Sequence, residues 1–289
     1  MADFMGQVKA LFYPAPGIKR DPVLMLGGAR HEWFEFRPAE YTVWTGINGH
    51  GKSLMLNQVL LGLMQQGERV MVFSGEMPPP QQGKRLVKQA TGLDRPTLGY
   101  IDAVGEWVRE RMWLFNLVGT AKLDRLLEVF SYGVRRYGIT HFVIDSLMMI
   151  DVPADGPGSI TAQQVAVQKI TSFAKKTGAH VHLVAHPRKG KDETQAPGKM
   201  DVSGSGMITN GSDNMFTVWS AQKDASKPDD GSPDALLEMH KNRHGEITHF
   251  KLWLFFNRAA QQYCLDSRRR PISVVPYSGD VYVAHEETA

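Results

Sequence analysis

The chain has 289 residues, 42% of them hydrophobic, which is enough to bury one large core. Its 33 basic and 30 acidic residues give a formal net charge of +3, which excludes a histone-like polycation and limits any nucleic-acid surface to a local patch. The single cysteine, Cys264, excludes an internal disulfide framework and a cysteine-rich zinc module. No apolar stretch approaches the roughly 20 residues of a membrane span, and the N-terminus does not resemble a secretory signal. We therefore expect a cytoplasmic protein without a membrane partner.

Residues 46–53 read Gly-Ile-Asn-Gly-His-Gly-Lys-Ser and match the phosphate-binding pattern G-x-x-x-x-G-K-[ST]. A β-branched and aromatic run at 41–45 precedes the pattern, and a segment of helical spacing at 54–61 follows it. The glycines let backbone N–H groups point at phosphates, Lys52 is expected to reach the β- and γ-phosphates, and Ser53 supplies a hydroxyl ligand for Mg²⁺. The pattern predicts a site for ATP, or another NTP, with Mg²⁺, formed by Gly46, Asn48, Gly49, His50, Gly51, Lys52, Ser53 and Leu54.

Short apolar runs alternate with longer segments of helical periodicity, as a wound α/β sheet requires. Parallel strands are predicted at 70–73, 141–144, 181–184 and 215–219, and helices at 123–137 and 162–177. Later runs without intervening helices predict antiparallel strands at one sheet edge, at 236–240, 247–256, 262–265 and 281–284. The predicted fold class is α/β, with a mostly parallel central sheet flanked by helices and with antiparallel edge strands near the C-terminus.

Two carboxylates follow predicted strands. Glu76 comes just after the run 70–73, within Ser-Gly-Glu-Met, and Asp145 ends the run 141–145. Because ligands of an open parallel sheet bind at the carboxyl ends of strands, both acids are expected to face the phosphate loop. Glu76 is a candidate to polarise the attacking water, and Asp145 is a candidate second anchor for Mg²⁺. Two alternatives stay open: Glu76 as a solvated loop carboxylate, and Asp145 as a residue that only starts a turn.

Three further candidates come from later segments. His186 follows the strand predicted at 181–184 and is placed to hydrogen-bond the γ-phosphate, although a core or turn histidine is the competing interpretation. Lys241 and Arg243 are two residues apart, so in an extended segment their side chains point the same way. Such a pair suits a nucleotide phosphate of a neighbouring subunit, with an exposed basic hairpin as the alternative.

The order of these motifs resembles a known family. The phosphate loop, Ser-Gly-Glu-Met, a strand ending in Asp, a strand ending in His-Pro-Arg-Lys and a Lys-x-Arg-x-Gly hairpin follow one another along residues 30–265. This arrangement is similar to the RecA-like motor domain of DnaB-family (superfamily 4) replicative helicases, in particular the Twinkle and phage primase-helicase branch. The segments of closest local similarity are 36–46, 186–189 and 204–206 leading to 213–214.

The resemblance implies roles for individual residues. It makes Lys52, Glu76, His186, Lys241 and Arg243 catalytic, with Glu76 activating water, His186 in the sensor position and Arg243 as the finger inserted into the adjoining subunit's site. It also implies that Ser53 and Asp145 hold the metal and, as weaker candidates, that Arg258 and Tyr263 pack on the nucleotide base. The DNA-contacting loops of the family correspond to residues 151–160 and, more convincingly, to residues 189–206, for which a mobile basic loop without a ligand is the alternative. The expected DNA contacts are Arg188, Lys189, Lys191 and Lys199.

The resemblance also implies partners. These are single-stranded DNA, further copies of the chain in a ring that is usually a hexamer, and a separate primase or polymerase, in the cytoplasm of a bacterium or of a phage-infected host. We expect residues 1–29 to form an N-terminal extension and residues 30–289 to form the RecA-like ATPase domain. Within the extension, residues 3–12 form either a short helix that docks on the next subunit or a disordered tail.

Two classes of function fit these observations. One is an ATP-dependent ring helicase that threads single-stranded DNA and unwinds duplex DNA, in the 5'–3' sense by resemblance. The other is a RecA-like ATPase of the RadA or KaiC type that binds DNA and regulates recombination or replication without unwinding. Strand separation on a forked duplex discriminates between them.

Overall fold

The computed structural model describes residues 5–12, 25–26, 29–30, 34–115, 117, 119–153, 156–186, 206–221, 223 and 230–281. Within this part of the chain, strands form a nine-stranded sheet in the order β11-β10-β9-β8-β3-β7-β6-β4-β5. The strands are β3 (Tyr41–Thr45), β4 (Val70–Ser74), β5 (Met112–Phe115), β6 (His141–Asp145), β7 (His180–Val184), β8 (Asn214–Ser220), β9 (Ala235–Asn242), β10 (Phe250–Asn257) and β11 (Gln262–Cys264). Two-residue strands β1 (Met25–Leu26) and β2 (Ala29–Arg30) pair separately.

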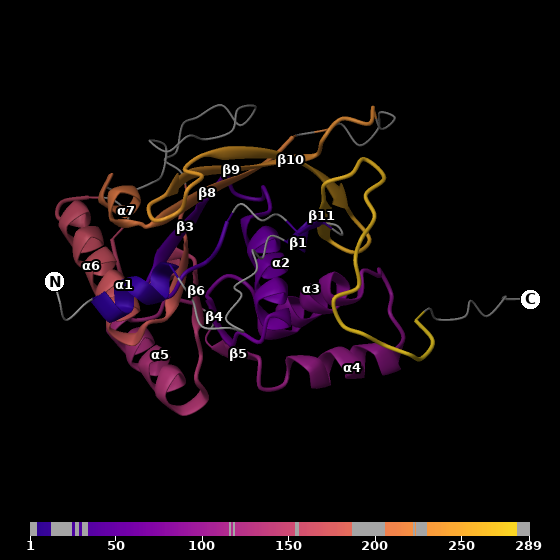
Figure 1. Cartoon of the computed structure of the whole chain (residues 1–289), viewed down its shortest axis with the longest axis horizontal. Coiled ribbons are helices and arrows are strands. Elements are labelled where there is room, and N and C mark those ends of the chain that lie inside the picture. The colour runs from indigo at the N-terminus through magenta and orange to yellow at the C-terminus, as the bar shows by residue number, and fades with distance from the viewer. Residues whose placement is uncertain are drawn as a thin grey trace, which may run out of the picture.

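The sheet is parallel from β8 through β5 and antiparallel from β8 through β11. Helices cover both of its faces (Figure 1). They are α1 (Met5–Phe12), α2 (Lys52–Gln65), α3 (Pro79–Thr91), α4 (Leu98–Val108), α5 (Leu123–Tyr137), α6 (Ser159–Thr177) and α7 (Gly206–Gly211), with a 3-10 turn at Leu147–Met149. This mixed sheet with flanking helices confirms the predicted fold class.

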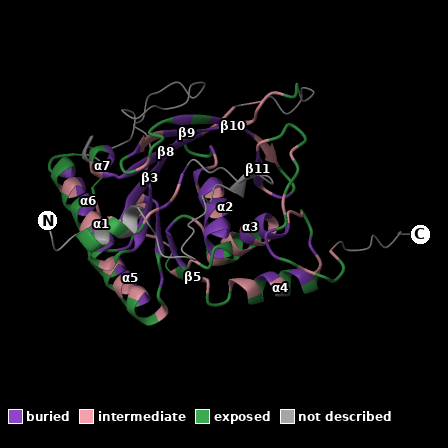
Figure 2. Cartoon of the chain, viewed as in Figure 1, coloured by how far each residue is buried: buried purple, intermediate pink, exposed green. Residues whose placement is uncertain are grey.

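Alternation along the buried strands divides the core into two clusters, one on each face of the sheet. Trp44 and the other strand residues on its face of the sheet pack with α2, α3 and α4, whereas Tyr41 and Val43 belong to the cluster that includes α5 and α6. The central strands β3, β4, β6 and β7 are buried along their whole length, whereas β5 is partly exposed and parts of β10 are exposed, and the helices have both buried and exposed faces (Figure 2). This two-sided burial explains why the core strands read as continuous apolar runs.

The predicted core strands and the helix at 123–137 are confirmed, and the helix predicted from residue 162 begins earlier, at Ser159. Helices α3 and α4 and strand β5 were not predicted from the sequence. Helix α3 begins with Pro79 and Pro80, which resemble a loop in the sequence but fit a first helical turn because the N–H that proline lacks would be unpaired there. Of the last predicted strand, Val281 is irregular and residues 282–284 lie outside the described part.

Buried histidines connect β6 and β7 to β3, the strand that leads into the phosphate loop. His141 and His182 are 3.2 Å apart between Nδ1 and Nε2, and Trp44 donates its indole N–H to His182 Nδ1 at 3.3 Å. His180 meets the Thr42 hydroxyl at 2.8 Å. Burial lowers the pKa of His182 well below its usual value, and the charges of His180 and His141 lower it further. The core therefore requires a neutral His182.

This requirement predicts acid sensitivity. The unfolded chain takes up a proton at His182 below a pKa of about 6.5, while the folded chain does not, so the free energy of unfolding falls as the pH drops below that value. We expect urea unfolding to give a lower stability at pH 5.5 than at pH 7.5, by about 1 kcal/mol. His182→Gln removes the titrating group and should reduce that difference; an unchanged difference would contradict this assignment.

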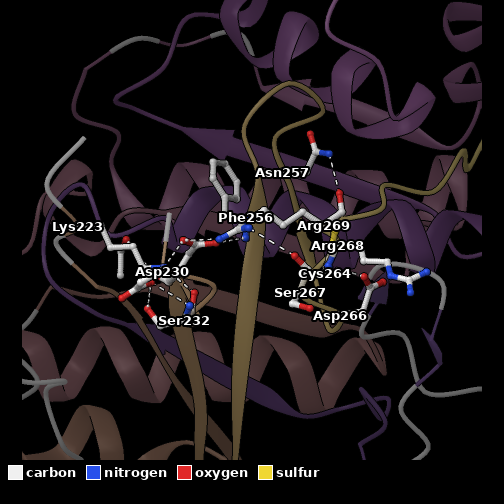
Figure 3. A network of polar contacts seen from close by, with 12 residues as sticks. Lys223, Asp230, Ser232, Phe256, Asn257, Cys264, Asp266, Ser267, Arg268 and Arg269 are labelled. Atoms are coloured by element: carbon white, nitrogen blue, oxygen red, sulfur yellow. Dashed lines mark hydrogen bonds and ion pairs between the residues drawn. The ribbon is translucent and has the colours of Figure 1, made fainter. Parts of the chain in front are cut away.

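A polar network around Asp234 holds the segment that follows β11 against the antiparallel strands β9 and β10. Asp234 accepts hydrogen bonds from Arg269 Nε at 2.9 Å and from the Phe256 N–H at 2.8 Å, and it lies 3.2 Å from Lys223 Nζ. Figure 3 shows Arg269 reaching across this network toward the side on which Lys223 and Asp230 lie. The segment that follows β11 is thereby held against β10, the strand that leads into the turn carrying Arg258.

Candidate nucleotide-binding site

The phosphate loop joins the carboxyl end of β3 to α2, as predicted. Gly46, Gly49 and Gly51 all have positive φ angles, of 146°, 81° and 88°. A Cβ on Gly46 would lie 2.0 Å from the Val218 carbonyl oxygen, and one on Gly51 would lie 1.9 Å from the Tyr263 hydroxyl. Backbone conformation and close neighbours therefore both require glycine at two of these positions.

Lys52 is buried and donates to the loop's own carbonyls, at 2.7 Å to Gly46 O and 3.0 Å to Ile47 O. Burial lowers the pKa of Lys52 to about 8, while the charges of Asp145 and Glu76 act in the opposite direction. Backbone carbonyls carry only partial charge, so a buried ammonium group that they hold is further stabilised by a full anion, which a nucleotide phosphate would supply. The arrangement fits the role predicted for Lys52.

Ser53 and Asp145 lie together at the end of the loop. The Ser53 hydroxyl donates to Asp145 Oδ2 at 2.7 Å, and burial raises the pKa of this carboxyl, with the Ser53 hydrogen bond opposing the rise. A divalent cation would stabilise the charged carboxylate, and oxygen donors are what Mg²⁺ prefers. The residues present therefore fit Mg²⁺, which would neutralise charge on the phosphates and orient them.

Glu76, Ser146 and His186 form the next group of contacts. The Ser146 hydroxyl donates to Glu76 Oε1 at 2.9 Å, and His186 Nε2 lies 3.2 Å from that hydroxyl and 3.4 Å from Glu76 Oε1. The Glu76 side chain is 49% exposed, so water reaches it. His186 Nδ1 is buried and has no hydrogen-bond partner in the described structure, and burial, followed by the Lys52 charge, lowers the pKa of this ring. His186 thus offers a polar atom that a ligand or water would satisfy.

Gly75 places Glu76 at this edge. The Gly75 N–H donates to Asp145 O at 3.0 Å, which continues the pairing of β4 with β6. A Cβ on Gly75 would lie 2.5 Å from Met149 Cβ and 2.8 Å from Gly119 O. The tight contact explains why glycine occupies this position.

Arg85 was not predicted from the sequence as a site residue. It is half-buried on α3 and lines a pocket together with Ser53, Asp145 and Met77. Burial lowers the pKa of Arg85, and the charge of Asp145 opposes that change. Because α3 was not predicted, no sequence signal placed this cation beside the phosphate loop.

The remaining predicted nucleotide contacts occupy different surroundings. Asn48 is exposed, His50 is buried with Nδ1 accepting the Ser220 N–H at 3.1 Å, and the Leu54 carbonyl accepts a hydrogen bond from Gln89. Tyr263 is 3% exposed with its hydroxyl beside Gly51, and Arg258 is exposed in the β10–β11 turn. Tyr263 therefore packs against the phosphate loop at Gly51. That Tyr263 or Arg258 contacts a nucleotide base stays a prediction.

Lys241 and Arg243 converge on one place, as their spacing predicts. Lys241 Nζ donates to Thr209 O at 3.1 Å, to Asn210 O at 3.0 Å and to Ser212 O, and Arg243 donates to Asn210 O at 3.1 Å. Carbonyls at the end of α7, together with the Asp213 carboxylate 3.5 Å from Arg243 Nη1, thus supply the negative charge that the paired cations need.

This cation pair lies far from its own phosphate loop. The Arg243 N–H donates to the carbonyl of Asp213, next to the start of β8, which pairs with the start of β3. The phosphate loop begins at the other end of β3, roughly 16 Å further along a five-residue strand. The four predicted DNA contacts, Arg188, Lys189, Lys191 and Lys199, lie outside the described residues.

Together these features define a RecA-like P-loop nucleotide-binding domain. The family described as an AAA domain matches residues 33–192, which is more than half of the chain, and the chain belongs to that family. No helix among the described residues is long and apolar enough to cross a membrane.

Two curated relatives match parts of the chain. A "Twinkle homolog protein, chloroplastic/mitochondrial" from Arabidopsis thaliana is 26% identical over 199 residues, which are 63% of this chain and 28% of the relative. A "DNA repair protein RadA" from Brucella abortus (strain 2308) is 29% identical over 146 residues, which are 50% of this chain and 27% of that protein. The chain thus matches little more than a quarter of either relative.

Two solved structures share the fold. One, described as an ATPase domain, superposes with a TM-score of 0.76 at 13% identity, covering 91% of this chain and 97% of that one. A DnaB-like replicative helicase, solved in a study of its interactions with primase, superposes with a TM-score of 0.72 at 12% identity, covering 90% of this chain and 67% of the other. The predicted resemblance to a DnaB-family motor domain is confirmed.

The packing around Gly75 predicts that Gly75→Ala destabilises the protein and lowers nucleotide hydrolysis, since the added methyl would displace Met149 or the Gly119 carbonyl. We expect a loss of roughly 1–3 kcal/mol in urea unfolding. The matched control is Gly83→Ala on α3, where nothing lies within 4 Å of the added methyl and the gain in helix propensity predicts unchanged or higher stability. Equal effects of the two substitutions would refute the packing argument.

Proposed function

We propose that the chain is the ATP-driven motor of a ring helicase that moves along single-stranded DNA and unwinds duplex DNA. The observation that supports the proposal is that the charged groups of the proposed site are divided between the two ends of the strands of the sheet. Lys52, Asp145 and Glu76 gather at the carboxyl ends of the parallel strands, while Lys241 and Arg243 lie at the opposite end, where β3 and β8 begin. A site that needs all five is complete only when a second subunit contributes the cation pair.

The contacts suggest how hydrolysis proceeds. Lys52 leaves its loop carbonyls to hold the β- and γ-phosphates. Ser53 and Asp145 would hold Mg²⁺, which would neutralise charge on the phosphates. Glu76 accepts a proton from the attacking water. Ser146 fixes Glu76 and also contacts His186, so a change at the γ-phosphate is transmitted through His186 to the residues that follow β7.

In its finer form, the proposal follows the helicase relatives. Single-stranded DNA passes through the centre of a ring, a hexamer by resemblance, in the 5'–3' sense, and a separate primase or polymerase cooperates. Support comes from the similarity to the Twinkle homologue and from the shared fold of the DnaB-like helicase. The similarity to a protein named as DNA repair protein RadA favours a second candidate, an ATPase that binds DNA in recombination without unwinding it.

Glu76→Gln tests the proposed motor. We expect DNA-stimulated ATP hydrolysis to fall by about 10²–10⁴-fold, because the amide no longer takes a proton from water, while nucleotide binding is retained. Hydrolysis and fluorescent-nucleotide binding are measured with and without single-stranded DNA, and unwinding is followed on a forked duplex with a 5' tail. Glu76→Gln turnover equal to wild type would contradict the assignment, and DNA-stimulated hydrolysis by wild type without unwinding would favour the RadA-like alternative.

Arg243→Ala tests the contribution from a second subunit. Alone it should lower DNA-stimulated hydrolysis by roughly 10³-fold or more, as loss of an arginine finger does. Mixing Arg243→Ala with Glu76→Gln should restore some activity, because a ring then contains interfaces that pair an intact Glu76 with an intact Arg243. No recovery in rings shown to contain both variants would contradict a trans role. The control, exposed Glu246→Ala, should retain wild-type hydrolysis.

A further inference from the structure

A second cluster of chemically active side chains lies on the antiparallel edge of the sheet. Glu238 and His240 are two residues apart on β9, at an irregularity in the pairing of β9 with β8, and their side chains lie in contact. Lys251 of β10 is the cross-strand partner of Glu238, and Thr217 of β8 is its partner on the other side. His249 immediately precedes β10 and also contacts Glu238.

The three potential ligands are close enough to share one ion. Glu238 Oε1 lies 2.9 Å from His249 Nε2 and 3.6 Å from His240 Nδ1. One ligand atom from each residue falls within 4.8 Å of the other two. Ligand atoms about 2.1 Å from a tetrahedral metal are roughly 3.4 Å apart, so these separations need little change to enclose a cation.

The hydrogen bond to Thr217 orients the His240 ring as a metal ligand. Its Nε2 lies 2.8 Å from the Thr217 hydroxyl, and donation of Nε2–H to that oxygen leaves the lone pair on Nδ1, which faces Glu238. Metal-binding histidines are oriented by such a bond at the other ring nitrogen. Both the Glu238 and the His240 side chains are only 10% exposed, whereas His249 is 53% exposed and leaves a path for an ion.

Lys251 is the main competitor for the carboxylate. Its Nζ lies 3.3 Å from Glu238 Oε1, and its side chain is 52% exposed. An ion pair to a lysine this exposed is weak, so an incoming cation can displace it. Because Lys251 already neutralises Glu238, the pairing does not account for two further imidazoles converging on the same carboxylate.

We propose that Glu238, His240 and His249 bind a divalent transition-metal ion. Two imidazole nitrogens and one carboxylate oxygen fit Zn²⁺ in particular, with a fourth position left for water or an outside ligand. The ion joins the two ends of the turn at 243–249, which begins with Arg243. A consequence that rests on the proposed function is that Zn²⁺ holds this turn for the neighbouring subunit, whereas metal binding itself is independent of that function.

The test is a Zn²⁺ titration of the full chain against a chelating dye, with excess Mg²⁺ present and without nucleotide. Wild type should bind one Zn²⁺ per chain at this site, and Glu238→Gln, His240→Ala and His249→Ala should each weaken binding at least tenfold. Lys251→Ala should tighten it, because the competing cation is gone. The matched control is His244→Ala, another histidine paired with a carboxylate, Glu40 at 3.0 Å, and it should leave the affinity unchanged.

Two results would overturn the proposal: undiminished affinity in His249→Ala, or equal losses in His249→Ala and His244→Ala. His249 is the most exposed ligand, so its variant decides the matter if His240→Ala or Glu238→Gln does not fold. Co²⁺ offers an independent measurement, since tetrahedral coordination gives strong visible absorption that His249→Ala should abolish. None of these measurements depends on ATP hydrolysis, so failure of the metal site and failure of the motor are distinguishable.

Discussion

The in-register parallel pairing of β3, β7, β6 and β4 is the constraint on which the site depends. Because Ser74 pairs with Asp145, the residues that follow β4 and β6 emerge side by side. The 2.7 Å contact between Ser53 and Asp145 then connects β6 to the start of α2. A slip of one residue in any pair would turn the side chains to the wrong face and separate the carboxylates from the phosphate loop.

Close backbone packing reinforces that alignment. Gly46 and Gly51 allow Val218 and Tyr263 to lie directly against the phosphate loop. Gly75, next to Glu76, allows Met149 to pack closely against the backbone there. Each of these neighbours comes from a distant part of the sequence. The loop conformation is therefore supported by the assembled sheet and its edge strands, and not by local sequence alone.

Much of the fold and part of the site were predictable because they depend on local patterns. The phosphate loop, the buried strands and the convergence of Lys241 with Arg243 follow from glycine spacing, apolar runs and strand periodicity. Arg85 was missed because the Pro-rich start of α3 resembles a loop, and the link through Ser146 requires knowledge of which strand ends are neighbours. The packing of Tyr263 beneath Gly51 is likewise set by tertiary contacts that spacing does not encode.

In the proposed ring, Arg243 changes its partners from its own chain to the adjoining subunit. In the single chain it donates to the carbonyls of Asn210 and Ser212, at 3.1 and 3.2 Å. The most direct measurement is a cryo-EM structure of the protein with a non-hydrolysable ATP analogue and single-stranded DNA. We expect a closed ring in which Arg243 contacts the γ-phosphate bound to the adjoining subunit's Lys52. A nucleotide-loaded ring in which Arg243 stays on Asn210 and Ser212 of its own chain would contradict this expectation.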